Sequence, residues 1–131
     1  MERRTINPWR WQEKLGYAQS IEVRGGERVL YCAGQTATNA DGQPQHAGDM
    51  AAQLSAAMDN VETVLREAGY GLADLVRLNY YTTDVPAFFA HYGVLTERLA
   101  AAGCLPSGTL LGVSRLARPE LLVEIEGTAV R

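Results

Sequence analysis

The segment LVRLNYYT, residues 75–82, alternates apolar and polar side chains along its length. In an extended chain, successive side chains point to opposite faces, so Val76, Leu78 and Tyr80 share one face. The residues between them, which are mostly polar, share the other face. This pattern predicts a β-strand with one face on a hydrophobic core, and the rest of the fold is built outward from it.

Segments with a helical spacing of apolar residues lie on both sides of this strand. Before it, apolar side chains recur every three or four positions over residues 50–68, and Gly69 follows as a stop signal. After it, a similar stripe covers residues 88–102, with Asp84 as the expected N-cap and Gly103 as the stop. Each helix has one apolar face, so both are expected to pack on one face of a sheet.

The remaining apolar runs are bounded by turn residues and predict further strands. Residues 18–23 and 28–33 flank two glycines and are expected to form a hairpin, and a short strand is expected around Thr36. Residues 110–116 and 121–130 form the closing pair, joined by the turn ARPE. The order β-β-(β)-α-β-α-β-β predicts an α+β fold with the helices on one face of a mixed sheet.

The size and charge of the chain limit its function. Its 131 residues suit one domain over residues 1–131, with an N-terminal arm over residues 1–16. The formal net charge of -3 argues against a nucleic-acid partner. The first residues lack the apolar core of a signal peptide, and no stretch approaches the ~18 apolar residues of a membrane span. We therefore expect a cytoplasmic protein that does not bind membranes, with Cys32 and Cys104 as reduced thiols.

The sheet face away from the helices also needs a cover. It would carry Tyr31 or Cys32, Tyr81, and Leu110 or Leu111, a surface too apolar to leave in water. Self-association is the simplest cover, and the residues alone do not give the number of subunits.

Two carboxylates, Glu124 and Glu126, lie on one face of the last predicted strand, roughly 7 Å apart. They are unusual on a mostly apolar strand, because burying an unpaired charge costs free energy. Two interpretations stay open. One carboxylate orients or activates water, or the carboxylates lie at a solvated edge or pair with Arg115 across a hairpin.

The stretch CAGQTAT, residues 32–38, is a second candidate for a site. Gly34 ends an apolar run and Gln35 follows, so the backbone there can approach a ligand closely. A bulge or a turn is the alternative. No nucleotide-binding or metal-binding spacing occurs in the chain, so no cofactor and no metal are expected.

Four segments together resemble the RidA (YjgF/YER057c/UK114) family: GYAQSIEV, LYCAGQTATNADGQPQHAGDMAAQ, GLADLVRLNYYTTDVPAFFAHY and LLVEIEGTAV. The resemblance covers nearly the whole chain, with the segments in the same order and at similar spacing. It implies a chorismate-mutase-like α+β fold assembled as a homotrimer, with the sheets packed into a central barrel. Such a barrel would cover the second sheet face, and the clefts of the family lie between adjacent subunits.

The best-known members of this family hydrolyse reactive 2-imino and enamine acids to 2-oxo acids and ammonia. In them an arginine just after a proline clamps the substrate carboxylate, because a guanidinium pairs with it through two hydrogen bonds. A glutamate helps to position the attacking water, and a tyrosine near the N-terminus lines the cleft. Backbone groups near a Gly-Gln pair complete the site.

Most of these features have counterparts in this chain. By the resemblance, Tyr17 and Glu124 are the expected catalytic residues, and Gly34 and Gln35 supply backbone that binds the substrate. Tyr92 takes the place of a helix asparagine and is expected to contact the substrate as well.

The carboxylate clamp has no such counterpart. Gly108 stands where the family has its arginine, and Leu110 stands where the family often has Cys or Thr. With Thr109 between them, these residues are expected to line a wider and less charged cleft. Arg115 follows seven positions after Gly108, which is roughly 23 Å in an extended chain. Substrate binding by Arg115 or Arg10 of a neighbouring subunit stays open.

These observations predict a hydrolase or deaminase-type enzyme in a homotrimer. Its substrate would be a reactive imine, an enamine or another uncharged or aromatic metabolite, bound in a cleft between subunits and attacked by water with the help of Glu124. Two alternatives stay open: the 2-imino acid deaminase of the best-known members, and a trimer that binds a metabolite without chemistry. The ribonuclease role of some relatives is disfavoured by the acidic charge.

Overall fold

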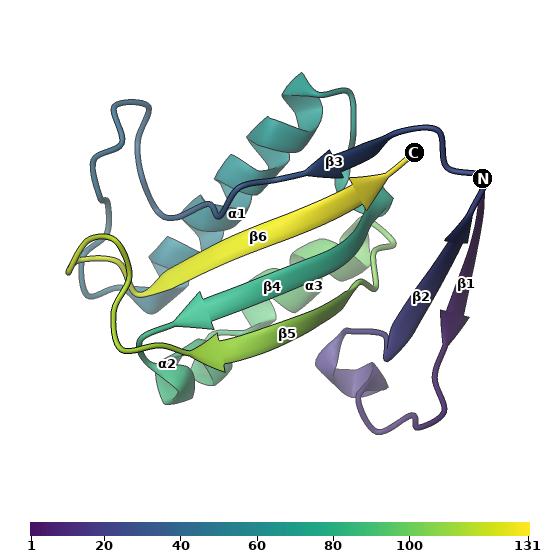
Figure 1. Ribbon diagram of the computed structural model, residues 1–131. Helices are drawn as coiled ribbons and strands as arrows, with labels where there is room; N and C mark the ends of the chain where they lie inside the picture. The colour runs from purple at the N-terminus through teal and green to yellow at the C-terminus, as the bar shows by residue number, and fades with distance from the viewer.

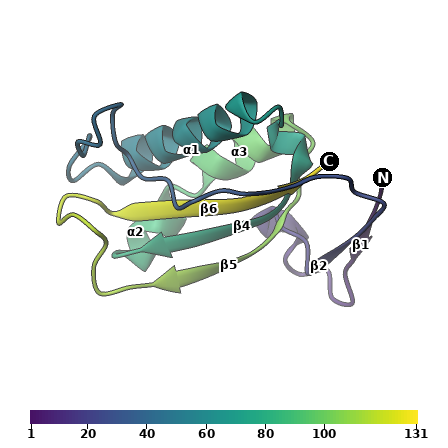
Figure 2. The same ribbon diagram turned by 45° about the horizontal axis from the view of Figure 1, so that its top comes forward.

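Strand β4 (Leu75–Thr82) lies inside a four-stranded sheet in the computed structural model, which describes residues 1–131 (Figure 1). The strand order is β3 (Val29–Tyr31), β6 (Val123–Val130), β4 and β5 (Ser107–Gly112). β4 pairs antiparallel with β6 and parallel with β5, so the sheet is mixed. One face is covered by helices α1 (Met50–Glu67), α2 (Val85–Ala90) and α3 (Gly93–Ala101) (Figure 2). The α+β fold predicted from the sequence is confirmed.

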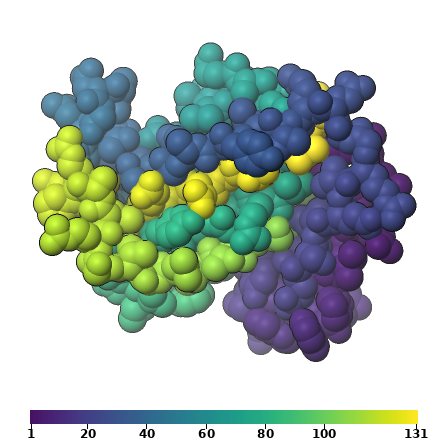
Figure 3. Space-filling view, in the orientation of Figure 1, coloured from purple at the N-terminus to yellow at the C-terminus, as the bar shows by residue number.

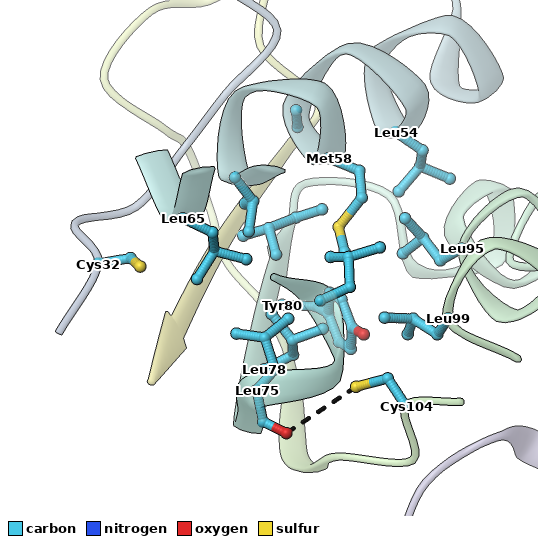
Figure 4. Packing of buried hydrophobic residues seen from close by; sticks show 14 of the residues in the cluster. Cys32, Leu54, Met58, Leu65, Leu75, Leu78, Tyr80, Leu95, Leu99 and Cys104 are labelled. Carbon is cyan, nitrogen blue, oxygen red and sulfur yellow. Dashed lines mark hydrogen bonds between the residues drawn. The ribbon is translucent and has the colours of Figure 1, made fainter. Parts of the chain in front are cut away.

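The hydrophobic core lies between the helices and the sheet (Figure 4). Its fully buried side chains come from α1, α2, α3, β4 and β6, among them Leu54, Met58, Phe88, Leu95, Leu99, Leu78 and Ile125. Burial alternates along β4 and β6, as the sequence pattern of residues 75–82 predicts. The two cysteines are both free and buried. No helix combines the length and the hydropathy that crossing a bilayer requires.

The N-terminal strands differ from the prediction. β1 (Glu2–Ile6) and β2 (Ser20–Arg24) form a separate antiparallel pair, and β3 pairs with β6. The predicted hairpin between residues 18–23 and 28–33 is therefore wrong. All residues of β1 are exposed, so no alternation of apolar and polar side chains marks this strand in the sequence.

The contacts between the N-terminal pair and the main sheet explain this arrangement. The guanidinium of Arg3 donates to the backbone oxygens of Ala73, Asp74 and Val130. Gly26 passes so close to β6 that an added Cβ would lie 2.5 Å from Val130 Cγ1. The chain is thus held beside β6 after β2 and does not fold back on β2.

Between β3 and α1 the predicted short strand around Thr36 is reduced to isolated bridges, which join Gln35 to Ile125 and Thr38 to Pro44. The predicted second helix is divided into α2 and α3. His91 at the end of α2 has φ -117 and ψ 9, which is not helical, and α3 begins again at Gly93. Short 3-10 turns precede β2 and β4, at Glu13–Leu15 and Leu72–Asp74.

The closing strands also differ from the prediction. β5 ends at Gly112, so the predicted strand over residues 110–116 starts and ends too late, and Arg115 lies in an exposed loop. β5 and β6 are not neighbours, because β4 lies between them. The chain crosses from β4 through α2 and α3 to β5, and such a crossover brings the second strand in parallel to the first.

Gln53 of α1 joins two loops to the core. Its fully buried side chain donates to the backbone oxygens of His46, at 3.1 Å, and Glu120, at 2.8 Å. Its Oε1 accepts a hydrogen bond from the N–H of Leu122, at 2.8 Å. One amide therefore anchors the loop before α1 and the loop before β6.

Replacing Gln53 with leucine is expected to lower the free energy of unfolding by about 2–4 kcal/mol, because three hydrogen bonds are lost and buried backbone groups are left unpaired. Urea unfolding at a fixed protein concentration measures this change. The control is Gln43→Leu in the exposed loop before α1, for which we expect a change below about 0.5 kcal/mol. Equal losses in both variants would contradict the anchoring role of Gln53.

Gly108 sets the spacing between β4 and β5. It lies opposite Leu78 in the parallel register, and a Cβ added at this position would be 1.9 Å from the backbone oxygen of Leu78. Any other residue would thus require the two strands to move apart. The close packing of β4 and β5 therefore requires glycine at position 108.

The variant Gly108→Ala is expected to lose about 1–3 kcal/mol of unfolding free energy, because the added methyl group overpacks a backbone contact. The matched variant is Gly93→Ala at the start of α3, where an added Cβ meets no atom within 4 Å. It should be neutral or slightly stabilising. Thermal unfolding of both variants compares the two positions, and a harmless Gly108→Ala would show that β5 adjusts freely.

Candidate functional site

A cavity of about 400 Å³ opens between β4, β5, α2 and the segment before β2. Six aromatic side chains line it: Trp11, Tyr17, Tyr80, Phe88, Phe89 and Tyr92. The rest of the wall comes from Leu15, Leu78, Pro106 and residues 107–110 of β5. None of the lining residues carries a charge, so the cavity favours apolar, planar and neutral groups.

The floor of the cavity is an aromatic cluster. The ring of Tyr80 lies 5.5 Å from that of Phe88 and 6.2 Å from that of Tyr92, measured between centroids. Phe88 and Tyr92 are four positions apart, one turn of a helix, and their centroids are 5.3 Å apart. The strand places Tyr80 on the helix-covered face, where it meets these two side chains.

The mouth of the cavity is also aromatic. Trp11 is 60% exposed and Phe89 is 54% exposed, although both line the cavity. Trp11 makes an edge contact with Tyr17 at a centroid distance of 6.4 Å. The segment before β2 thereby forms the wall that faces α2.

Two tyrosines in this cavity have perturbed pKa values. Burial raises the pKa of Tyr80 well above its ordinary value, and the nearby Tyr92 and Cys104 raise it further. Burial raises the pKa of Tyr92 as well, with a smaller contribution from Tyr17. Their hydroxyl groups make no hydrogen bond within the chain and remain protonated donors at neutral pH.

A second group of polar side chains lies on the uncovered sheet face, which Figure 3 shows with β3, β6, β4 and β5 side by side. Glu126 accepts hydrogen bonds from the hydroxyl of Tyr81 and from Nδ2 of Asn79, the latter at 3.1 Å. The bond to Glu126 raises the pKa of Tyr81. Oδ1 of Asn79 accepts from the N–H of Thr109 at 3.2 Å. Glu126 is therefore engaged in holding β6, β4 and β5 together.

Glu124 differs from Glu126 because it forms neither a hydrogen bond nor an ion pair within the chain. It stands opposite Tyr81 in the register of β4 and β6. A Cβ added at Gly34 would lie 2.0 Å from Oε1 of Glu124, so only glycine allows this close approach. Gln35 exchanges two backbone hydrogen bonds with Ile125, at 2.7 and 2.9 Å. These bonds fix the backbone of residues 34–35 beside the free carboxylate.

The structure divides the predicted site residues into two groups on opposite faces of the sheet. The cavity brings together Tyr17, Tyr92, Gly108 and Leu110, whereas Thr109 lines both the cavity and a hollow on the uncovered face. The uncovered face brings together Glu124, Gly34 and Gln35. Within one chain Glu124, Gly34 and Gln35 do not line the cavity.

The arginines considered as substitutes for the missing clamp lie outside the cavity. Arg10 donates to Glu13 at 2.7 Å, and Arg115 lies in the exposed loop before β6. The interpretation that Arg115 pairs with Glu124 or Glu126 is wrong, since no such ion pair forms and β5 and β6 are not adjacent. Thr109 at the rim accepts a hydrogen bond from Arg77 at 3.1 Å, and Arg77 lies on the other sheet face.

The sequence analysis did not identify four aromatic residues of the cavity, Trp11, Tyr80, Phe88 and Phe89. Two of them left a signal in the pattern. Tyr80 is on the core face of its strand, and Phe88 begins the apolar stripe of the following helix. That these residues are aromatic and not aliphatic indicates a cavity wall only once β4 and α2 are known to be in contact. No group of three or more His, Cys, Asp or Glu side chains is placed to hold a metal ion.

Comparisons with known proteins agree with the fold and the motifs. Residues 12–131 match the family model described as Endoribonuclease L-PSP. A RutC family protein of Pyrococcus abyssi is 28% identical over 115 residues, which are 88% of this chain and 86% of that protein.

Solved structures give the same result. The Yersinia pestis protein YyfB, a protein of unknown function of the Rid family, is 37% identical with a TM-score of 0.86, and each chain is covered to 100%. The YjgF gene product of Escherichia coli is 26% identical with a TM-score of 0.71, over 88% of this chain and 87% of that one. The resemblance found in the sequence motifs is confirmed: the chain belongs to the RidA (YjgF/YER057c/UK114) family, whose family model bears the name Endoribonuclease L-PSP.

Proposed function

We propose that this protein is a RidA-type enzyme that adds water to a small uncharged imine or enamine bearing an aromatic group. The reaction would take place in a cleft shared by two subunits of a homotrimer. The observation that supports this proposal is the separation of the aromatic cavity and the unpaired carboxylate of Glu124 onto opposite faces of one sheet. A second copy of the chain is the simplest way to bring both to one substrate.

The uncovered sheet face supports the same assembly. Tyr31 is 80% exposed, and Val29 and Leu111 are exposed beside the polar groups of β4 and β6. Apolar side chains gathered on one face of a folded protein are typical of an interaction surface. In the proposed trimer this face packs against neighbouring subunits, and Glu124 of one subunit reaches the cavity of another.

The proposed chemistry needs one base and one proton donor. The carboxylate of Glu124 takes a proton from water while the water oxygen adds to the imine carbon, and then gives this proton to the imine nitrogen. The same carboxylate moves the hydroxyl proton of the product to the amino nitrogen. The carbon–nitrogen bond of the resulting carbinolamine then breaks, which releases ammonia and leaves a carbonyl compound. Imine and water are thus converted to ketone or aldehyde and ammonia without a cofactor.

The absence of a positive charge in the cavity supports an uncharged substrate. A carboxylate buried without a partner loses its hydration and gains nothing in return. Gly108 supplies no side chain, and Arg10 is already paired with Glu13. We therefore do not propose the 2-imino acid deaminase reaction, nor a ribonuclease, because the chain has a net charge of -3.

The first test uses acetophenone imine, a neutral aromatic ketimine, and follows the release of acetophenone and ammonia above the spontaneous rate. Glu124→Gln is expected to lower kcat at least about 100-fold, because the general base is lost while the shape is kept. Glu126→Gln is the matched control, two positions away on the same face, and should keep most of the activity. The molar mass of each variant in solution checks that assembly is unchanged.

Each other outcome of this test has a definite meaning. Turnover that survives Glu124→Gln would remove this residue from the mechanism. A properly assembled protein that accelerates no imine hydrolysis would contradict the enzyme and favour a trimer that binds a metabolite without chemistry.

A second prediction concerns charged substrates. A freshly generated pool of 2-iminopropionate and 2-aminoacrylate should release ammonia and 2-oxo acid no faster with the protein than without it, because nothing in the cavity binds the carboxylate. Ammonia and 2-oxo acid are measured in parallel. Acceleration that disappears in Glu124→Gln would show that another cation replaces the clamp and that the protein is a 2-imino acid deaminase.

A further inference from the structure

Tyr80 is the most buried of the three tyrosines that line the aromatic cavity. The residue is 7% exposed, and its ring is held by Phe88 and Tyr92 on two sides. The hydroxyl has no hydrogen-bond partner in the chain, although nearly all buried polar groups in proteins have one. The hydroxyl is not completely shut off from solvent. The one side-chain nitrogen or oxygen that is both fully buried and without a hydrogen-bond partner is Nε2 of Gln12, not the hydroxyl of Tyr80. Because Tyr80 lines the cavity, its hydroxyl is a donor without an acceptor at the cavity wall.

The surroundings of this hydroxyl define what it can bind. Leu78 and Leu110 of the strands line the same cavity as Tyr80, together with Phe88, Phe89 and Tyr92. No charged side chain reaches the cavity, so a buried ion would have no partner there. A volume of about 400 Å³ suits a small ring compound, and aromatic walls favour a flat ring.

We propose that the cavity binds a neutral aromatic ligand and that the hydroxyl of Tyr80 donates a hydrogen bond to the single acceptor atom of that ligand. This inference rests on the proposed function for the reaction and names the substrate class of the same site. For an imine the acceptor is the nitrogen, and for the carbonyl product it is the oxygen. Tyr80 thereby selects molecules that carry an acceptor next to the ring and orients the reacting bond.

The raised pKa of Tyr80 agrees with this role, since the hydroxyl keeps its proton over the whole neutral range. Tyr92 also faces the cavity but is less buried, and Tyr17 lies toward the mouth beside Trp11. Because Tyr80 is the most buried of these tyrosines, its hydroxyl is the one that we expect to distinguish among ring compounds of one shape.

The test uses three probes of nearly equal shape. Acetophenone has a neutral acceptor, α-methylstyrene replaces that oxygen with a methylene group, and benzoate replaces the methyl ketone with a carboxylate. Binding is followed by NMR through the indole N–H signal of Trp11 at the cavity mouth. Trp9 is 63% exposed and does not line the cavity, so its indole signal is an internal reference, and Trp9→Phe assigns the two signals.

Acetophenone is expected to bind with saturation, and α-methylstyrene about three- to tenfold more weakly, because one hydrogen bond is missing. Benzoate should bind at least about 100-fold more weakly than acetophenone, because its charge has no partner. Tyr80→Phe removes only the hydroxyl and should make the affinities for acetophenone and α-methylstyrene equal.

The matched control is Tyr70→Phe. Tyr70 is also buried, but its ring lies under the guanidinium of Arg28 and outside the cavity. This variant loses a tyrosine hydroxyl from a buried site and should keep the preference for acetophenone. An unchanged preference in Tyr80→Phe, or benzoate binding as tight as that of acetophenone, would overturn the proposal. So would the absence of saturable binding for all three probes.

The binding test and the turnover test fail independently. Acetophenone binding that depends on Tyr80, in a protein that hydrolyses no imine, would uphold the ligand class and contradict the enzyme. Imine hydrolysis that depends on Glu124 but is indifferent to Tyr80→Phe and to the charge of the substrate would uphold the enzyme and overturn the ligand class.

Discussion

Neighbouring residues of β4 point to opposite faces of the sheet, and this alternation governs the rest of the structure. Tyr80 faces the helices and closes the floor of the aromatic cavity, whereas Tyr81 faces outward and bonds to Glu126. β6 runs beside β4 in register, so it repeats the division and places Glu124 on the outer face. A site that needs both the cavity and Glu124 therefore needs more than one chain, because no movement of a side chain crosses the sheet.

The parts of the fold that the sequence predicts are those with a buried and an exposed side. β4, α1 and the two C-terminal helices show regular spacing of apolar residues because each packs one face on the core. β1 shows none, since both of its faces are exposed and cross-strand pairs such as Arg4 with Glu22 help to hold it to β2. The register and order of β3, β5 and β6 depend on contacts between distant segments, which spacing along the chain does not record.

For the same reason, the candidate site can be predicted only in part from the sequence. The motif resemblance pointed to Glu124, Gly34 and Gln35, and the structure places these residues together. Tyr80 and Trp11 have no counterpart in the quoted family features, and they become visible only when β4, α2 and the N-terminal segment enclose one volume. By the resemblance, Gly108 stands where the family has an arginine side chain. The structure adds that β5 lies too close to β4 at Gly108 for any side chain to stand there without moving the strands.

A cleft without a guanidinium suits different substrates from a cleft that holds an arginine beside its glutamate. In a cleft that holds an arginine and a glutamate, the two charges compensate each other and a substrate carboxylate pairs with the arginine. In the proposed cleft Glu124 stands beside a cavity that has no charged lining residue, so a second anion would be repelled as well as poorly solvated. A neutral imine carries no net charge and is not repelled. The same carboxylate that takes a proton from water thus also disfavours anionic substrates.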